Sequence, residues 1–133
     1  MYKQIEQTWR KVYKENLSLL RKRAEKWRQQ EAIIRLQKPT RLDRARKLGY
    51  KAKQGYVTVR VRLSRRGKRI HRPTSGRRPM HAGVVKIKTK VNYRKTAINR
   101  ASEKYLNMKA LNAYYVFNDG KNIWYEVILK EEN

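Results

Sequence analysis

Seven cations crowd sixteen consecutive residues of this sequence, 64–79, with no Asp or Glu among them. They are Arg65, Arg66, Lys68, Arg69, Arg72, Arg77 and Arg78, and His71 lies between them. Arginine makes bidentate contacts to phosphate oxygens and stacks on bases, so this composition is typical of a surface that binds a phosphate polyanion. Because the run has glycines and prolines but few apolar residues, we expect a long basic loop over residues 64–83 that orders only against its partner.

Residues 55–63 lead into this loop and alternate in polarity as a strand does. Valines and a leucine occupy one side of the predicted strand, and Thr58, Arg60 and Arg62 occupy the other. The two arginines would lie roughly 6.5–7 Å apart, close to the spacing of successive phosphates on one nucleic-acid strand. We expect the apolar side to pack on a core and the other side to present both guanidinium groups to nucleic acid. A solvated sheet face is the alternative.

Two further basic surfaces are expected on helical segments. The first surrounds residues 40–53 and contains Arg41, Arg44, Arg46, Lys47, Lys51 and Lys53. The second lies on the outer faces of helices within residues 2–30 and includes Arg21, Arg23 and Arg28. Charged helix faces are often simply solvated, but the total charge of the chain favours contact with RNA at both surfaces.

The net charge of +26 is concentrated in the middle of the chain. Residues 44–102 carry 20 Lys or Arg and no Asp or Glu, whereas residues 103–133 have a net charge of −1. Self-repulsion of this size destabilises a compact fold, so a polyanionic partner is expected. The division predicts a basic binding region attached to a nearly neutral folding anchor.

Several classes of function are disfavoured. The chain has no cysteine, and both histidines, His71 and His81, fall in the basic loop without a carboxylate nearby, so we expect no enzyme, no metal and no cofactor. No signal peptide and no apolar run of about 20 residues is visible, so we expect no membrane partner. A small-molecule substrate is not expected either.

Several elements must position these cations. Apolar spacing predicts two helices within residues 2–30, with a break near Asn16, and Glu31–Gln37 is expected to be extended. Thr40 is expected to cap a short helix that Gly49 closes, and Asn92 to cap a helix over residues 93–106. Residues 111–129 predict a hairpin around a turn at 118–121, and residues 84–91 form a short strand or an extended connector.

These elements predict an α+β fold, with a small antiparallel sheet of three strands, a packed helix and a long basic loop. We expect a helical N-terminal extension over residues 1–38. Residues 39–133 would form the α+β core, with the basic loop 64–83 inserted in it. The polar N-terminal helices would pack beside this core or reach away from it.

The segment at residues 39–56, which reads PTRLDRARKLGYKAKQGY, is distinctive enough to suggest a family. It resembles the archaeal and eukaryotic family of protein fifteen of the large ribosomal subunit, the "e" type. The similarity continues through VRVR at 59–62, GRRP at 76–79, LNAYYV at 111–116 and WYEVIL at 124–129, and it also includes Trp9 and residues 26–28.

The resemblance implies a structural constituent of the large ribosomal subunit that binds and stabilises folded large-subunit rRNA. It also implies an antiparallel α+β core, neighbouring large-subunit proteins as further partners, and a cytoplasmic, ribosome-bound location. Charge alone leaves a nonspecific DNA-compacting protein as the alternative. That alternative predicts similar affinity for duplex DNA and structured RNA at matched salt.

Overall fold

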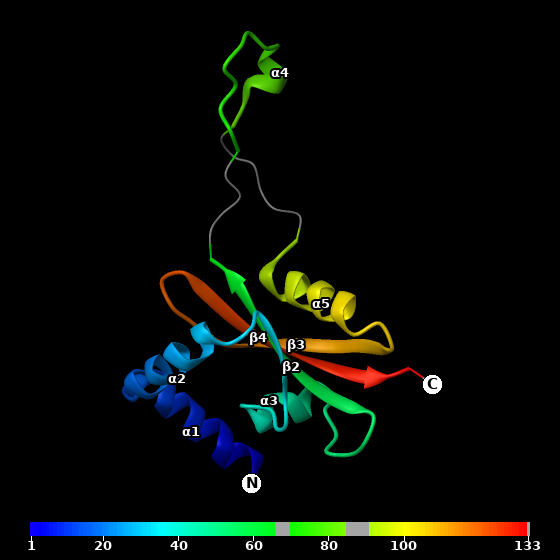
Figure 1. Cartoon of the computed structure of the whole chain (residues 1–133). Coiled ribbons are helices and arrows are strands. Elements are labelled where there is room, and N and C mark those ends of the chain that lie inside the picture. The colour runs from blue at the N-terminus through cyan, green and yellow to red at the C-terminus, as the bar shows by residue number, and fades with distance from the viewer. Residues whose placement is uncertain (66–69, 85–90, 133) are drawn as a thin grey trace.

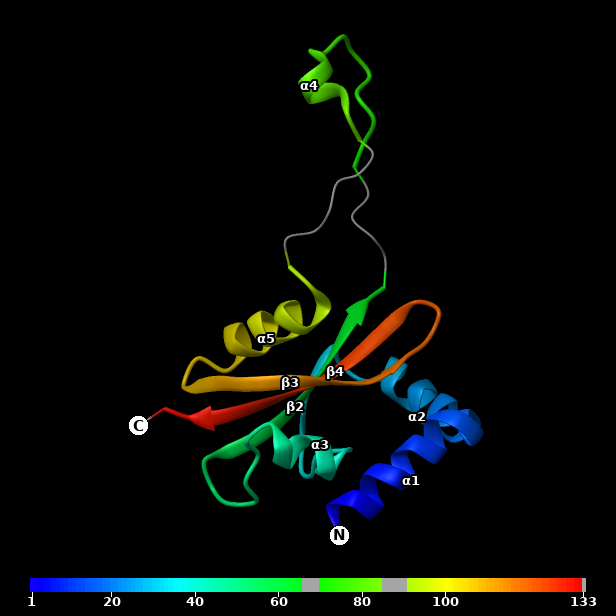
Figure 2. The same cartoon turned by 180° about the vertical axis from the view of Figure 1, so that it is seen from behind.

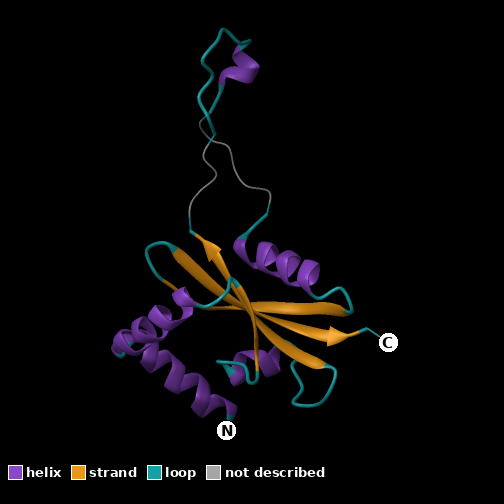
Figure 3. Ribbon diagram, in the orientation of Figure 1, coloured by secondary structure: helices purple, strands orange, loops and turns teal. Residues whose placement is uncertain are grey.

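The computed structural model describes residues 1–65, 70–84 and 91–132. In chain order its elements are α1 (Tyr2–Glu15), α2 (Leu17–Gln29), β1 (Ile33–Leu36), α3 (Leu42–Lys47), β2 (Tyr56–Ser64), α4 (Pro79–Ala82), α5 (Tyr93–Lys104), β3 (Met108–Asn118) and β4 (Asn122–Glu131). Figures 1 and 3 show a twisted sheet with helices on both of its faces, and α4 lies well away from that sheet. The predicted strand or connector at 84–91 falls almost entirely outside the described residues.

The sheet has four antiparallel strands in the order β1-β2-β4-β3. The hairpin of β3 and β4 follows the prediction: Asp119 Oδ1 accepts hydrogen bonds from the backbone N–H groups of Lys121, at 2.8 Å, and Asn122, at 2.5 Å. The predicted α+β class is confirmed. The sequence analysis assigned three strands to the sheet. The fourth, β1, lies within residues 31–37, which were expected to be extended but were not assigned to the sheet, and it pairs with β2.

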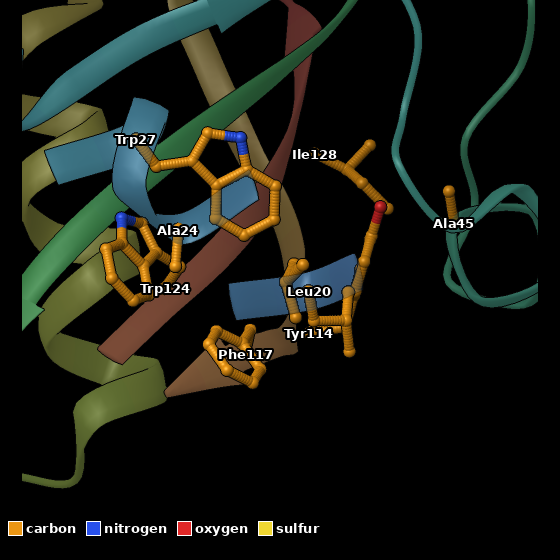
Figure 4. Packing of buried hydrophobic residues seen from close by; sticks show 9 residues of the cluster. Leu20, Ala24, Trp27, Ala45, Tyr114, Phe117, Trp124 and Ile128 are labelled. Atoms are coloured by element: carbon orange, nitrogen blue, oxygen red, sulfur yellow. The ribbon is translucent and has the colours of Figure 1, made fainter. Parts of the chain in front are cut away.

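Each face of the sheet carries its own apolar cluster. Valines of β2 and β4 pack with Ala97 and Ala101 of α5 on one face. On the other face, Leu20, Ala24 and Trp27 of α2 pack against aromatic residues of β3 and β4, as Figure 4 shows. Of the two expected arrangements, the N-terminal helices therefore adopt the packed one: they lie against one face of the sheet and do not reach away from it.

Aromatic residues dominate the face that α2 covers. The indole ring of Trp124 is fully buried, with Phe117 stacked at 6.2 Å and Trp27 edge-on at 5.7 Å between ring centroids. Contacts of this kind contribute about 0.5–1.5 kcal/mol each beyond burial alone. This cluster fixes α2 on the sheet and thereby sets the direction of the cationic surface of α2.

Three predicted local signals can be compared with the structure. Asn92 caps α5, because its side chain accepts a hydrogen bond from Lys95 N at 2.9 Å, and Gly49 has a φ of +100° after α3, so both predictions are confirmed. Thr40 does not cap α3, whose N-cap is Arg41 without a side-chain hydrogen bond. Thr40 instead donates two hydrogen bonds to the buried carboxylate of Glu126, one from its backbone N–H and one from its hydroxyl.

Candidate nucleic-acid interface

A basic surface forms on α3 and the turn after it. Buried Ala45 and half-buried Leu48 face inward, and the chain then turns back through Gly49. The cations of this segment that are exposed are Arg44, Arg46, Lys47, Lys51 and Lys53. We call these five residues the α3 surface.

Most cations of the α3 surface are held by aromatic rings or ion pairs without being buried. The Arg46 guanidinium lies 5.9 Å from the centroid of the Tyr50 ring, and Lys53 Nζ lies 5.9 Å from that of Tyr56. Lys47 Nζ is 2.7 Å from Glu6 Oε2, and this contact with a cation lowers the pKa of the Glu6 carboxyl. Such weak contacts orient the side chains while their charge remains open to a polyanion.

Arg41 was predicted to face outward with this surface, and that expectation is wrong. Its side chain is only 16% exposed, and its guanidinium lies 5.5 Å from the ring centroids of both Trp9 and Tyr13. Arg41 Nη2 is also 3.0 Å from Asp43 Oδ2, on a side chain that is itself buried. Arg41 therefore joins the segment that leads into α3 to α1, through the aromatic rings of Trp9 and Tyr13.

Arg60 was predicted to project from an open face of β2, and this expectation is also wrong. The residue is only 6% exposed, its guanidinium lies 4.4 Å from the centroid of the Trp27 ring, and it donates to Gln30 Oε1. Burial lowers the pKa of Arg60, and the nearby Glu126 opposes this effect. Arg62 is half-buried and donates to the backbone carbonyl of Arg28. The prediction from alternating polarity assumed that the polar side of β2 is open to solvent, whereas α2 covers that side.

Glu126 is a buried carboxylate that the sequence analysis did not single out. It is 0% exposed and accepts hydrogen bonds from Thr40 N, at 3.0 Å, and from the Thr40 and Tyr114 hydroxyls. Burial raises the pKa of Glu126, although the bonds from Thr40 and Tyr114 and the charge of Arg60 act in the opposite direction. A single Glu among apolar residues of a central strand was the available signal. Glu126 fastens the segment before α3 to β4.

The predicted cations of α2 divide into two kinds. Arg21 and Arg23 are exposed. Arg28 is exposed as well, but its Nη1 lies 3.3 Å from Asp119 Oδ2 in the β3–β4 turn. An exposed pair of this kind contributes little to stability and can exchange partners. All three residues therefore remain available to a polyanion.

Only part of the predicted basic loop lies within the described residues. His71, Arg72, Arg77 and Arg78 are exposed there. Arg65 is tied to the β3–β4 turn: its backbone N–H donates to Lys121 O and its Nη1 to Asp119 O, both at 2.8 Å. Arg66, Lys68 and Arg69 lie outside the described residues, so their predicted RNA contacts stay predictions.

A groove of about 550 Å³ lies beside the edge strand β3. Figure 2 shows β3 running between α5 and α3, the two helices that complete the groove. The lining residues are Arg41, Arg44, Leu48, Asn92, Tyr93, Arg94, Ala113, Tyr114, Tyr115 and Tyr125. We call this feature the β3 groove. The sequence analysis did not predict it, because residues from α3, α5, β3 and β4 meet there.

Features of metal sites and membrane spans can be judged for the described residues. In residues 1–65, 70–84 and 91–132, no three His, Asp or Glu side chains are grouped so as to hold a metal ion. None of the helices in this part of the chain is both long and apolar enough to cross a membrane.

The chain was also compared with models of known protein families. The family model described as "Ribosomal L15", of the L15e type, matches residues 1–133, which is the whole chain. The match also includes the segment 39–56 on which the resemblance was first noted. The chain belongs to the L15e family of ribosomal proteins, which are structural components of the large subunit.

Proposed function

We propose that this chain binds and stabilises folded large-subunit rRNA through Arg and Lys contacts to phosphates. Three surfaces carry these contacts: the α3 surface, the exposed cations of α2, and the basic loop. Arg41 and Arg60, which were candidates on the sequence alone, serve the fold instead, and Arg62 contributes only through its exposed part.

The observation that supports this proposal is the separation of acidic and basic residues along the chain. Of the ten carboxylates, Asp43 and Glu126 are buried, and Glu6, Glu31 and Asp119 form ion pairs. Residues 44–102 contain no carboxylate at all, so their exposed cations lack nearby acidic partners along the chain. Such a surface gains most from a partner of high negative charge density that releases counterions on binding.

Salt dependence of binding tests the proposal. The full chain would be titrated with a folded large-subunit rRNA fragment and with duplex DNA of equal length, over a range of salt concentrations. We expect tighter binding to the rRNA fragment at each salt concentration. Equal affinities for the two polyanions would instead support the DNA-compacting alternative.

The α3 surface offers a sharper form of this experiment. Replacing Arg44, Arg46, Lys51 and Lys53 together by Gln removes four cations that can each neutralise a phosphate from an exposed position. Since every phosphate left without its cation lowers the slope of log K against log salt by about 0.7–0.9, we expect a fall of roughly 3 in the slope. The urea midpoint of the free protein should change little, because these side chains are exposed. An unchanged slope would show that the α3 surface makes no phosphate contacts.

A further inference from the structure

We propose that the β3 groove binds an unpaired RNA base, stacked on Tyr115, with a neighbouring phosphate on Arg44. This inference rests on the proposed RNA-binding function and adds a site of a different kind, one that recognises a single-stranded nucleotide. The volume of the β3 groove, about 550 Å³, falls within the range of small-ligand pockets.

The aromatic part of the groove is held in place by the hydroxyl groups of its rings. Tyr115 OH donates to Asn118 Oδ1 at 2.7 Å, and Tyr93 OH donates to Arg65 O at 3.1 Å. Tyr115 and Tyr93 nevertheless remain 37% and 38% exposed. Since the hydroxyls are engaged, much of the surface that remains open belongs to the rings themselves. A ring positioned in this way loses little entropy when a base stacks on it.

The rings also support one another. Tyr115 lies 6.1 Å from Tyr125 in an edge-on arrangement and 6.5 Å from Tyr13 in a stacked one, measured between ring centroids. A base stacked on an aromatic side chain contributes about 1–3 kcal/mol and needs no particular base identity. The groove therefore has the means to hold a base without reading its sequence.

The charge of the groove fits a nucleotide. Its lining includes Arg44, Arg94 and the partly covered Arg41, and it contains no Asp or Glu. Arg94 is engaged with Asn112 Oδ1, and Arg41 with Asp43. Among the described residues Arg44 has no side-chain hydrogen bond or ion pair, so its guanidinium is the one we assign to a phosphate.

The edge of β3 argues against a peptide strand as the occupant. The pairing of β3 with β4 shifts register between Ala110 and Asn112 and again between Tyr115 and Phe117. Asn112 Oδ1 accepts a hydrogen bond from Ala113 N at 2.9 Å, so this backbone donor is already satisfied. Irregular edges of this kind are poor templates for an added strand. An unpaired nucleotide is therefore the occupant that fits both the shape and the charge.

The test uses the full chain and a hexa-uridylate RNA that carries one 2-aminopurine, because uracil neighbours stack only weakly on this base in the free RNA. Stacking should quench the 2-aminopurine fluorescence, while anisotropy reports binding. The variants are Tyr115→Leu, Tyr115→Phe and Arg44→Gln, and Tyr2→Leu is the matched control, since Tyr2 is 40% exposed but lies outside the groove. Urea midpoints of every variant confirm that each one is folded.

We expect Tyr115→Leu to weaken hexamer binding about 5- to 150-fold and to abolish quenching, without changing the salt slope. Tyr2→Leu should bind as the wild type does. Tyr115→Phe keeps the ring but loses the hydroxyl contact to Asn118, so it should retain quenching and bind more tightly than Tyr115→Leu. Arg44→Gln should lower the slope by about 0.7, the value for one phosphate contact on a single strand.

Two results would overturn the inference: binding without quenching in the wild type, or equal affinities for Tyr115→Leu and Tyr2→Leu. Neither result bears on the proposed function, which is tested with the folded rRNA fragment and duplex DNA. Equal affinities of the wild type for the folded rRNA fragment and for duplex DNA would instead count against the proposed function.

Discussion

Replacing Glu126 by Ala should destabilise the protein far more than replacing it by Gln. Glu126 is fully buried and accepts three hydrogen bonds, two of them from Thr40 and one from the Tyr114 hydroxyl. Alanine leaves all three donors without their acceptor and opens a cavity. Glutamine keeps the volume of the side chain, and its amide oxygen can still accept hydrogen bonds while its amide N–H donates to the Thr40 hydroxyl.

The magnitude follows from the number of donors left without a partner. A buried donor without an acceptor costs about 1–3 kcal/mol, and the half-buried position of Thr40 places its two groups at the low end of that range. We therefore expect Glu126→Ala to lower the free energy of unfolding by about 3–5 kcal/mol. Glu126→Gln should cost only about 1 kcal/mol. Domains of this kind are stable by about 5–15 kcal/mol, so a loss of this size is a large share of the total stability.

Urea unfolding followed by tryptophan fluorescence provides the measurement. The rings of Trp27 and Trp124 lie in the core cluster between α2 and the sheet, so their emission reports loss of that packing. Moderate salt would be used throughout to screen the self-repulsion of the chain. The reasoning would be refuted by equal losses in the two variants, or by a loss below about 1 kcal/mol for Glu126→Ala.

Three more predictions concern buried or strained positions. Because burial raises the pKa of Glu126, the folded state binds its proton more tightly than the unfolded state, so stability from this group should fall as pH rises above about 4.5, the ordinary value. Glu126→Gln should lack this component when urea midpoints are compared across pH. Arg60→Met should lower the midpoint but leave the salt slope for the rRNA fragment unchanged, since Arg60 is buried against Trp27; a slope reduced by about 0.7–0.9 would show a phosphate contact. Gly49→Ala should cost about 1–2 kcal/mol in urea unfolding, because φ is +100° there, and an unchanged midpoint would contradict that strain.

Local signals in the sequence predicted much of this fold correctly. The Asn118–Lys121 turn, the Asn92 cap and the left-handed Gly49 each depend on residues close together in the chain, and each was found where it was expected. The break between α1 and α2 at Asn16 was likewise predicted. Short-range hydrogen bonding and backbone preference suffice for features of this kind.

Features that depend on distant residues were not predicted. Arg60 was assigned to an open surface because alternation in one strand cannot show that α2 will cover its polar side. Thr40 was assigned to a cap because nothing local indicates that Glu126, 86 residues away, offers a better acceptor. The β3 groove was not predicted for the same reason, since its arginines and tyrosines come from four different elements.

Fewer cations are accessible to a partner than the composition of the chain suggests. Arg41 and Arg60 hold α3 and β2 to the N-terminal helices, and Arg65 is tied to the β3–β4 turn. Cations in these positions stabilise the shape that presents the others. Buried arginines thus hold the fold together, and we propose that the exposed cations bind the RNA.

A high-resolution reconstruction of a large ribosomal subunit that contains this chain would test whether buried and exposed cations divide in this way. The measured quantity is the distance from each guanidinium or ammonium group to the nearest rRNA phosphate oxygen. We predict hydrogen-bond distances for several cations of the α3 surface, and no phosphate contact for Arg60 or Arg41. Phosphate contacts at Arg60, or an α3 surface that faces only solvent, would contradict the account.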